Sequence, residues 1–215
     1  MKAVIQEICV GKPKEIKVNG EPTMTGIYKS AVEGPVDLSL TNLEGDEQAN
    51  LEVHGGRDKA VYVYSSLHYP FWQEQLGRAI MEPSQFGQNL TVGGLSDDEV
   101  KIGDRFKLGT AVVTVAQPRI PCAKLGARMG DPTFPNSFLL TGKLGYYLHV
   151  EEPGTLQQGD NMELLEAASH DVTVTSLWRT VFTPAHEVSV AKQAIDFPHL
   201  DNGWKKRLRA ILKSA

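Results

Sequence analysis

The sequence predicts a mainly β protein, a closed or nearly closed β-barrel followed by a short C-terminal segment of three helices. Residues 1–168 contain many short apolar runs of β-type composition, separated by turns rich in glycine, proline and asparagine. This pattern is typical of barrels, whose closure removes exposed sheet edges. Residues 169–215 instead place apolar side chains at helical spacing. We therefore expect a barrel domain over residues 1–168 and a helical segment over residues 169–215.

The expected strands follow one another along the barrel region, each ending at turn residues. They lie in "AVIQEICVG", "EIKVNG", residues 60–64, "NLTVGGLS", "VKIGDRFKLGTAVVTVAQPR" and near residues 145–151 and 161–165. The "GD" of "KIGDRFKLG" is expected to form a hairpin corner. The segment "LHYPFWQEQLG" predicts a short helix that ends at Gly77, because glycine accepts the left-handed conformation found at helix ends.

Three helices are expected in the C-terminal segment. The first begins after Thr173, a suitable N-cap, although the alternating "DVTVTS" leaves a strand open. Its apolar residues follow the i, i+3, i+4, i+7 pattern of a helix: Val174, Leu177, Trp178 and Val181.

The second and third helices are expected in "HEVSVAKQAIDF" and "DNGWKKRLRAILKSA". In the last one, Trp204, Leu208 and Ile211 share one face, and most of the basic residues lie elsewhere. These cations fit a solvated helix face better than a surface for an acidic partner.

The composition argues against several classes of partner and location. The chain has 215 residues, 41% of them hydrophobic, and a net charge of −4, which argues against nucleic acid or an anionic membrane as the main partner. No apolar run reaches about 18 residues, and the start lacks a signal-peptide core, so we expect a cytoplasmic protein that spans no membrane. The two cysteines form no disulfide framework, and Cys9, in a strand-like run without a nearby cation, is expected to be structural.

Several familiar catalytic motifs are missing from the sequence. It has no Walker-type phosphate loop, no G-x-G-x-x-G after a strand, no C-x-x-C pair, no zinc-protease H-E-x-x-H and no G-x-S-x-G. These absences weigh against a nucleotide-triphosphate enzyme, a classical dehydrogenase and a zinc hydrolase.

Three loops have the composition of an anion site. They contribute Lys29 in "TGIYKS", His54 and Gly55 in "HGGRDKA", and Asn89 and Thr91 in "FGQNLT". Glycine-rich turns that carry cations, hydroxyls and backbone N–H groups suit a ligand phosphate. Each loop by itself is more often an ordinary turn with a solvated side chain, so only their combination supports a binding site.

The stretch "QPRIPCAKLG" contains the second cysteine, Cys122. Pro118 and Pro121 stiffen the approach to it, and Arg119 and Lys124 are cations that favour a thiolate. A thiolate selects soft metal ions. The residues alone slightly favour the other interpretation, a small buried structural thiol.

Together these places resemble the MOSC-domain family, the domain named after the C-terminal part of molybdenum cofactor sulfurases, and most closely its stand-alone bacterial YiiM-type members. The matching pieces are "TGIYK", "LEGDEQAN", "HGGRDKAVYVYS", "FGQNLTV", "IGDRFKLG", "QPRIPCAKL" and "GYYLHVEEPG". In this order they cover roughly residues 22–165. Ala123 departs from the pattern, in which an aromatic residue is common at this position.

The resemblance implies that the chain binds the molybdenum cofactor, a pterin with a dithiolene and a phosphate, and that Cys122 ligates molybdenum. It also implies reduction of small N-hydroxylated substrates, such as hydroxylaminopurines, with electrons from a separate reductase. Lys29, His54, Asn89, Thr91 and Arg119 would then bind the cofactor, together with the loop at Gly55. Cys122 and His54 are the candidate catalytic residues, with Asp58 as a second candidate for proton relay.

Two other hypotheses remain open from the sequence. The same barrel would serve as a non-catalytic carrier of the molybdenum cofactor or as a sulfur-handling module. It would also serve as a plain interaction domain in which Cys122 is structural. A homodimer is compatible with all three, and none involves nucleic acid or a membrane.

Overall fold

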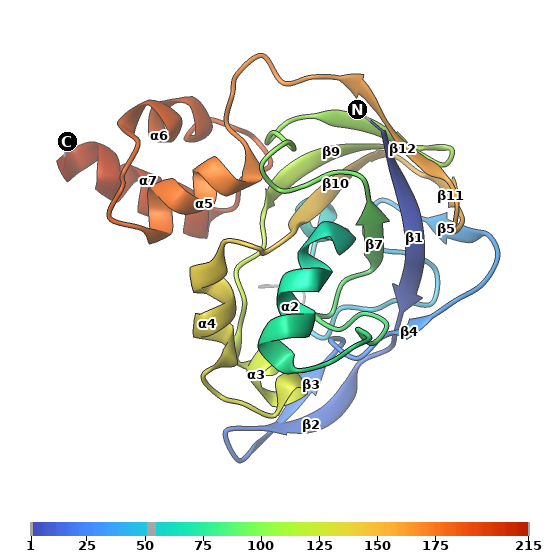
Figure 1. The fold of residues 1–215 in the computed structure, drawn as a ribbon. Helices are drawn as coiled ribbons and strands as arrows, with labels where there is room; N and C mark the ends of the chain where they lie inside the picture. The colour runs from blue at the N-terminus through green and yellow to red at the C-terminus, as the bar shows by residue number, and fades with distance from the viewer. Residues whose placement is uncertain (1, 51–54, 215) are drawn as a thin grey trace.

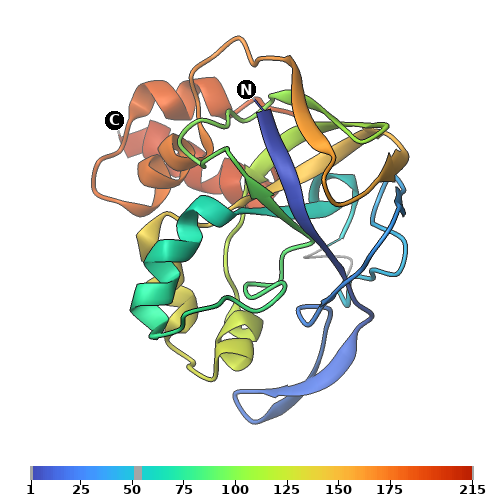
Figure 2. The same cartoon turned by 45° about the vertical axis from the view of Figure 1, so that its right-hand side comes forward.

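The computed structural model describes residues 2–50 and 55–214, and its centre is a closed β-barrel (Figures 1 and 2). Seven of the eight strands of the main sheet form the ring, which closes where β12 pairs with β1, Met162 lying opposite Ala3. In ring order the strands are β1 (Lys2–Val10), β12 (Asn161–Glu166), β8 (Arg105–Leu108), β9 (Ala111–Pro118), β10 (Tyr146–Glu152), β6 (Val61–Ser65) and β7 (Leu90–Gly93). The predicted mainly β, closed barrel is confirmed.

One pair of barrel strands, β6 and β7, is parallel, and the other neighbours are antiparallel. A parallel pair needs a long crossover connection, and this one contains η2 (Ser66–His68) and α2 (Tyr69–Leu76). Helix α2 ends at Gly77, whose φ of 61° is left-handed, as predicted. A short turn of helix, η1 (Arg57–Lys59), leads into β6.

Shorter strands surround the ring. β2 (Lys14–Val18) and β3 (Glu21–Thr25) form a separate hairpin that projects away from the barrel (Figure 1). Its turn places Asn19 and Gly20 at positive φ, 51° and 89°, the geometry of a tight hairpin turn. β4 (Ser30–Ala31) pairs with the end of β1, and β5 (Val36–Leu38) pairs with β11 (Gly154–Leu156).

The segment between β9 and β10 holds two helices that the sequence did not predict, α3 (Ala123–Met129) and α4 (Phe134–Thr141). Helices this short are marginal by themselves, and neither shows a long apolar period. α4 is stabilised by packing instead, because Phe134 and Phe138 lie in an aromatic cluster with Trp72.

The predicted hairpin corner at "GD" is wrong. Gly103 and Asp104 form a turn that precedes β8, where the buried Asp104 carboxylate accepts hydrogen bonds from the backbone N–H groups of Lys101 and Ala168 at 2.8 Å. The β8–β9 hairpin turns instead at Gly109, whose φ is 59°. The turn at Gly103 and Asp104 is therefore stabilised by the Asp104 side chain and does not connect two strands of a hairpin.

The C-terminal segment forms the three predicted helices, α5 (Val174–Phe182), α6 (Val188–Ala194) and α7 (Asn202–Ser214), gathered beside one end of the barrel (Figures 1 and 2). Thr173 caps α5 as predicted, accepting from Ser176 N at 3.0 Å, while Ser176 Oγ accepts from Thr173 N at 2.9 Å. This reciprocal capping box settles the choice between helix and strand.

One apolar core runs from the barrel into the helices. It includes Val115 and Leu148 on barrel strands as well as Leu177, Trp204 and Leu208 on α5 and α7. The helices therefore bury their apolar faces against the barrel. The domain boundary at residue 168 stays a prediction, although it falls between the last barrel strand and α5.

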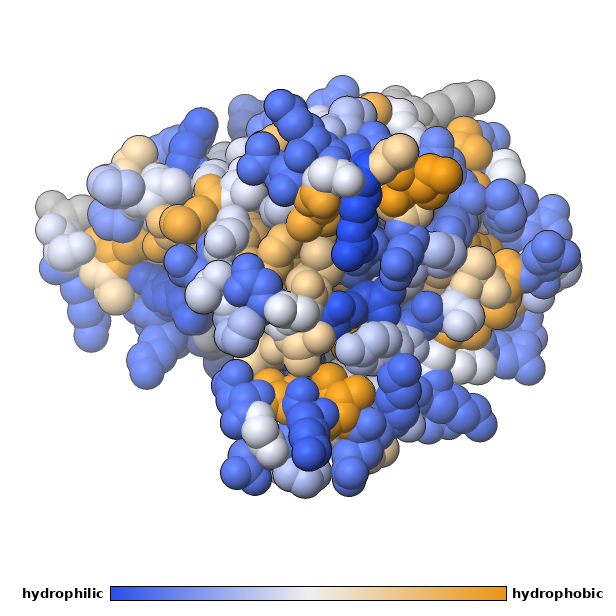
Figure 3. Space-filling view, turned by 60° about the horizontal axis from the view of Figure 1, so that its bottom comes forward, coloured by the Kyte–Doolittle hydropathy of each residue, from blue (hydrophilic) through white to orange (hydrophobic). Residues whose placement is uncertain are grey.

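The surface seen in Figure 3 is mostly hydrophilic, with apolar side chains in small, separate areas. Scattered exposed apolar residues of this kind are ordinary for a folded domain. Over residues 2–50 and 55–214, no helix combines the length and the hydropathy that crossing a bilayer requires.

Candidate functional site

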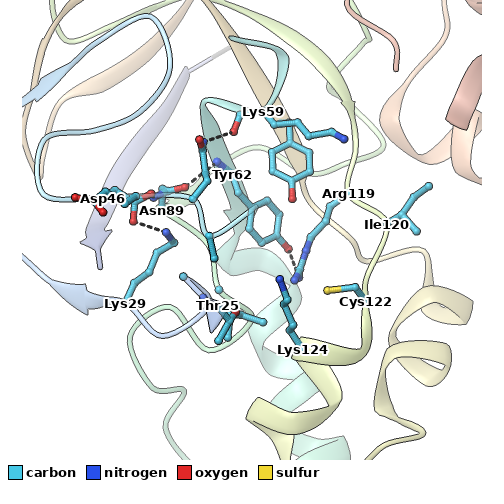
Figure 4. Close-up of a pocket in the computed structure, with 17 residues that line it drawn as sticks. Thr25, Lys29, Asp46, Lys59, Tyr62, Asn89, Arg119, Ile120, Cys122 and Lys124 are labelled. Atoms are coloured by element: carbon cyan, nitrogen blue, oxygen red, sulfur yellow. Dashed lines mark hydrogen bonds and ion pairs between the residues drawn. The ribbon is translucent and has the colours of Figure 1, made fainter. Parts of the chain in front are cut away.

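A pocket opens where the loops after β3 and β9 meet strands β6 and β10 (Figure 4). Its wall brings together segments that lie up to about half the chain apart in sequence. The side chains that matter below are those of Lys29, Asp46, Tyr62, Asn89, Arg119, Cys122, Lys124 and Tyr147. Of the predicted site residues, Lys29, Asn89, Arg119 and Cys122 therefore share one pocket.

One wall is a hydrogen-bonded unit built around Asp46. Its Oδ1 accepts from the Lys29 ammonium and, at 2.9 Å, from the backbone N–H of Gly11. Its Oδ2 accepts from Asn89 Nδ2 at 2.9 Å. The Lys29 and Asp46 side chains are only 7% and 2% exposed, so the cation and the anion are both withdrawn from water and neutralise each other.

Asn89 has little capacity left for a ligand. Its second amide hydrogen goes to the Cys9 carbonyl at 3.2 Å, and its Oδ1 accepts from the backbone N–H of Tyr62 at 3.1 Å. For Lys29, burial lowers the pKa and the adjacent Asp46 carboxylate raises it, leaving the pKa below its ordinary value. This wall is therefore fixed by internal contacts.

The opposite wall carries Arg119, which follows β9 and is buried. Its guanidinium lies 4.6 Å from the centre of the Tyr62 ring and donates to the Tyr62 hydroxyl at 3.3 Å. Burial raises the pKa of Tyr62 well above its ordinary value, so this partner is a neutral phenol. Within the described residues, no carboxylate lies within ion-pair distance of Arg119.

A buried guanidinium without an anionic partner is costly, because arginine keeps its charge at all ordinary pH values. The pocket in front of Arg119 is the place where an anionic ligand would supply the missing charge.

Cys122 lies beside this guanidinium, half-buried, on the same pocket wall (Figure 4). It stands directly before α3 in an extended conformation (φ −130°, ψ 172°). Lys124, two residues further along, adds a second cation to this side.

Cys9 differs from Cys122 in its burial and in its charged neighbours. It is 1% exposed on β1, and burial, followed by the nearby Glu7 carboxylate, raises the pKa of its thiol to about 12. Cys9 is thus a neutral, buried thiol, as expected for a structural residue.

Two of the predicted residues lie outside the pocket wall. Thr91 is buried on β7, outside the pocket wall, where its hydroxyl bonds to Glu7, Tyr69 and Gln88 at 3.2 Å. Gly55 does not line the pocket.

His54, a candidate for cofactor binding and proton relay, falls outside the described residues. Asp58, the second relay candidate, is not part of the pocket wall and is hydrogen-bonded to two imidazoles.

Asp46, Tyr62 and Tyr147 are site residues that the sequence does not mark. Asp46 stands in "LEGDEQAN", where an acidic residue near a glycine resembles any solvated loop, so no local signal marks it. Tyr62 and Tyr147 look like ordinary strand residues. Only the fold shows that the two tyrosines flank Arg119, and that Tyr62 and Tyr147 have ring centres 5.4 Å apart.

Known proteins share this architecture and sequence. A sequence profile of the MOSC domain matches residues 50–163, just over half of the chain. The chain belongs to the MOSC-domain family. The match includes Arg119, Cys122 and Lys124, whereas Lys29 and Asp46 precede it. MOSC domains are associated in general with binding of the molybdenum cofactor.

The relatives extend over the C-terminal helices as well. YflK of Bacillus subtilis (strain 168), an uncharacterized protein, is 39% identical over 91% of this chain and 88% of its own length. The crystal structure of YiiM from Geobacillus stearothermophilus has a TM-score of 0.80 at 30% identity, covering 98% of this chain and 99% of that one. The resemblance to YiiM-type members is therefore confirmed.

A third relative carries a functional name. A protein called "Reductase" from Gibberella moniliformis (strain M3125 / FGSC 7600) is 32% identical over 98% of this chain, which corresponds to 38% of that longer protein. This chain matches a part of that reductase.

The pocket of this MOSC domain fits an anionic group with a soft metal ion. Arg119 is a buried cation without a carboxylate partner in the described chain, Lys124 adds positive charge, and Cys122 offers a thiol at the same wall. Cations suit a phosphate, and a thiolate suits a metal ion that prefers sulfur.

Proposed function

We propose that this chain is a molybdenum-cofactor-dependent reductase of N-hydroxylated compounds, such as hydroxylaminopurines, that receives electrons from a separate reductase. Membership of the MOSC family and the relative named "Reductase" support a role in redox chemistry. The observation that carries the proposal is the buried Arg119 beside the Cys122 thiol, without a carboxylate partner among the described residues.

In this proposal each wall of the pocket has its own task. Cys122 supplies a thiolate ligand to the metal, and the charge of Arg119 stabilises that thiolate. Arg119 and Lys124 bind the phosphate of the pterin. The Lys29–Asp46–Asn89 unit forms a rigid opposite wall that orients the cofactor without adding net charge.

The bound molybdenum cofactor supplies reversible two-electron chemistry. Reduction of N–OH to N–H consumes two electrons and two protons and releases one water. The chain has two cysteines, one of them buried, and lacks the motifs of flavin and iron–sulfur sites, so the electrons come from another protein.

The first experiment measures molybdenum and pterin in the freshly purified protein and in two cysteine variants. We expect Cys122→Ser to lose the metal while its circular dichroism spectrum is unchanged, and Cys9→Ala to keep it. Unchanged metal content in Cys122→Ser would show that the ligand assignment is wrong.

The second experiment separates the enzyme from a carrier. Cofactor-loaded protein is incubated with a chemical reductant and a hydroxylaminopurine, and the amine product is quantified. We expect turnover that Cys122→Ser abolishes. Retained cofactor without turnover under any reductant would favour the alternative, a carrier or sulfur-handling module.

A further inference from the structure

Three potential metal ligands converge at a place outside the pocket wall. Asp58 lies on η1, His149 on β10 and His199 on the loop between α6 and α7. One ligand atom from each of the three lies within 4.8 Å of the others. Asp58 is 91 residues from His149 and 141 from His199 in sequence, so only the fold brings this group together.

We propose that Asp58, His149 and His199 bind a divalent transition-metal ion of the Zn²⁺ class, at a site distinct from the cofactor pocket. Two imidazole nitrogens and one carboxylate oxygen form a ligand set that such ions accept readily, with a remaining position for water. No step of the proposed reductase chemistry uses these three side chains.

The distances are close to those that a metal ion requires. The Nδ1 atoms of His149 and His199 lie 2.6 and 2.9 Å from the same oxygen, Asp58 Oδ1. Ligand atoms around a tetrahedral Zn²⁺ ion, each at about 2.0–2.1 Å from the metal, lie roughly 3.3 Å apart. A movement of less than about an ångström in the Asp58 side chain would therefore open the space.

The exposure of the three side chains allows this movement. Asp58 is 43% exposed and His199 25%, whereas His149 is only 11% exposed. The His149 imidazole, on a barrel strand, therefore provides a fixed ligand, and the two others face the solvent from which the ion and its water ligand arrive. The rings of His149 and His199 are stacked, with centres 3.7 Å apart and an angle of 27° between their planes.

Arg57, next to Asp58 in sequence, is a positive charge close to this group. Its Nη2 donates to the Val150 carbonyl at 2.8 Å, so its guanidinium is held by the backbone and not by the Asp58 carboxylate. A metal ion between the two Nδ1 atoms and Asp58 Oδ1 would replace the hydrogen bonds that join them now and would give the carboxylate a positive partner.

The site would attach the C-terminal helices to the wall of the pocket. Two residues after His199, Asp201 forms an ion pair of 2.9 Å with Lys59, which lines the pocket, and its backbone N–H donates to Gln117 Oε1 at 2.9 Å. A metal ion at the triad would reinforce these links between the loop at residues 196–201 and η1.

The test uses the full chain in a Cys122→Ser background, so that the pocket thiol cannot account for metal binding. After chelator treatment and dialysis, Zn²⁺ is titrated by calorimetry, and Co²⁺ is added as a visible probe of coordination. We expect one Zn²⁺ per chain, Co²⁺ absorption bands of low-coordinate geometry, and a rise in melting temperature on Zn²⁺ addition.

Matched variants assign the ligands. His199→Ala and Asp58→Asn should weaken Zn²⁺ affinity at least about tenfold, whereas His186→Ala, which removes an imidazole from another part of the C-terminal segment, should leave it unchanged. His199 lies on a loop, so His199→Ala tests the site even if a His149 variant fails to fold.

Two results would overturn the proposal. One is the absence of stoichiometric Zn²⁺ binding in the Cys122→Ser protein, which would leave the triad as a hydrogen-bonded contact only. The other is binding that His199→Ala and Asp58→Asn do not weaken. Neither result bears on the cofactor pocket, because its thiol is absent from the test.

Discussion

The two walls of the pocket differ in whether the protein neutralises their buried cation. Lys29 is buried against Asp46, whose carboxylate also holds Gly11 and Asn89. Arg119 is equally buried but faces a neutral phenol and a thiol. The first wall is electrostatically complete, and the second has positive charge that an anionic ligand would balance. Cations in one pocket therefore differ in function according to whether the protein itself neutralises them.

The largest expected effect on stability comes from disrupting the wall that contains Lys29 and Asp46. Asp46→Asn removes the negative charge and leaves the Lys29 ammonium buried without a partner, which should lower the free energy of unfolding by about 3–5 kcal/mol. Urea denaturation measures this loss.

Glu47→Gln is the matched control for Asp46→Asn. Its partner Lys12 lies 3.7 Å away and both side chains are largely exposed, so we expect a change within about 0.5 kcal/mol. Equal effects of the two variants would contradict the claim that the Asp46 wall is internally neutralised.

Removing the charge of the other wall should cost much less stability. Arg119→Met eliminates a buried cation that has no carboxylate partner among the described residues, so the free energy of unfolding of the cofactor-free protein should stay within about 1 kcal/mol of the parent or rise. The same variant should lose molybdenum on dialysis. A loss of stability as large as that of Asp46→Asn would show that Arg119 is structural.

The third prediction compares the two lysines as cofactor ligands. Lys124→Ala should weaken cofactor affinity roughly tenfold, because one charge-assisted contact to phosphate is lost. The double variant Lys29→Met/Asp46→Asn keeps the Lys29–Asp46–Asn89 unit neutral and should change cofactor affinity less than Lys124→Ala does. Retention is measured as molybdenum content after dialysis, and equal weakening would return Lys29 to the ligand set.

The last prediction, which needs no substitution, concerns the reactivity of the two thiols. A maleimide should label Cys122 and spare Cys9, because Cys9 is buried and its pKa of about 12 keeps the thiol protonated through pH 9. Mass spectrometry should find one label per folded chain and two in denaturant. Label on Cys9 in the folded protein would contradict this account.

Most of the fold was predictable, because it depends on local patterns. Strand runs ending at turns, the Gly77 helix end and the Thr173 cap are signals carried by a few neighbouring residues. The helices α3 and α4 were not predictable in this way. α4 depends on aromatic partners from α2 and the loop before β7, so its apolar residues show no period of their own.

The site residues were also predictable only where the signal is local. Cys122 and Arg119 were recognisable because they stand together on one proline-stiffened stretch. Thr91, chosen for its glycine-rich loop, lies on a buried strand outside the pocket wall instead. The glycine pattern could not reveal which face of the strand the hydroxyl occupies.

The sequence by itself determined the barrel, the helical tail and the presence of a cysteine between cations, because strand, turn and cap signals act over a few residues. Only the tertiary structure decided which of those cations are neutralised. Lys29 meets Asp46 across 17 residues and Arg119 meets Tyr62 across 57. Charge compensation depends on distance in space and on exclusion of water, and neither can be read from the order of residues along the chain.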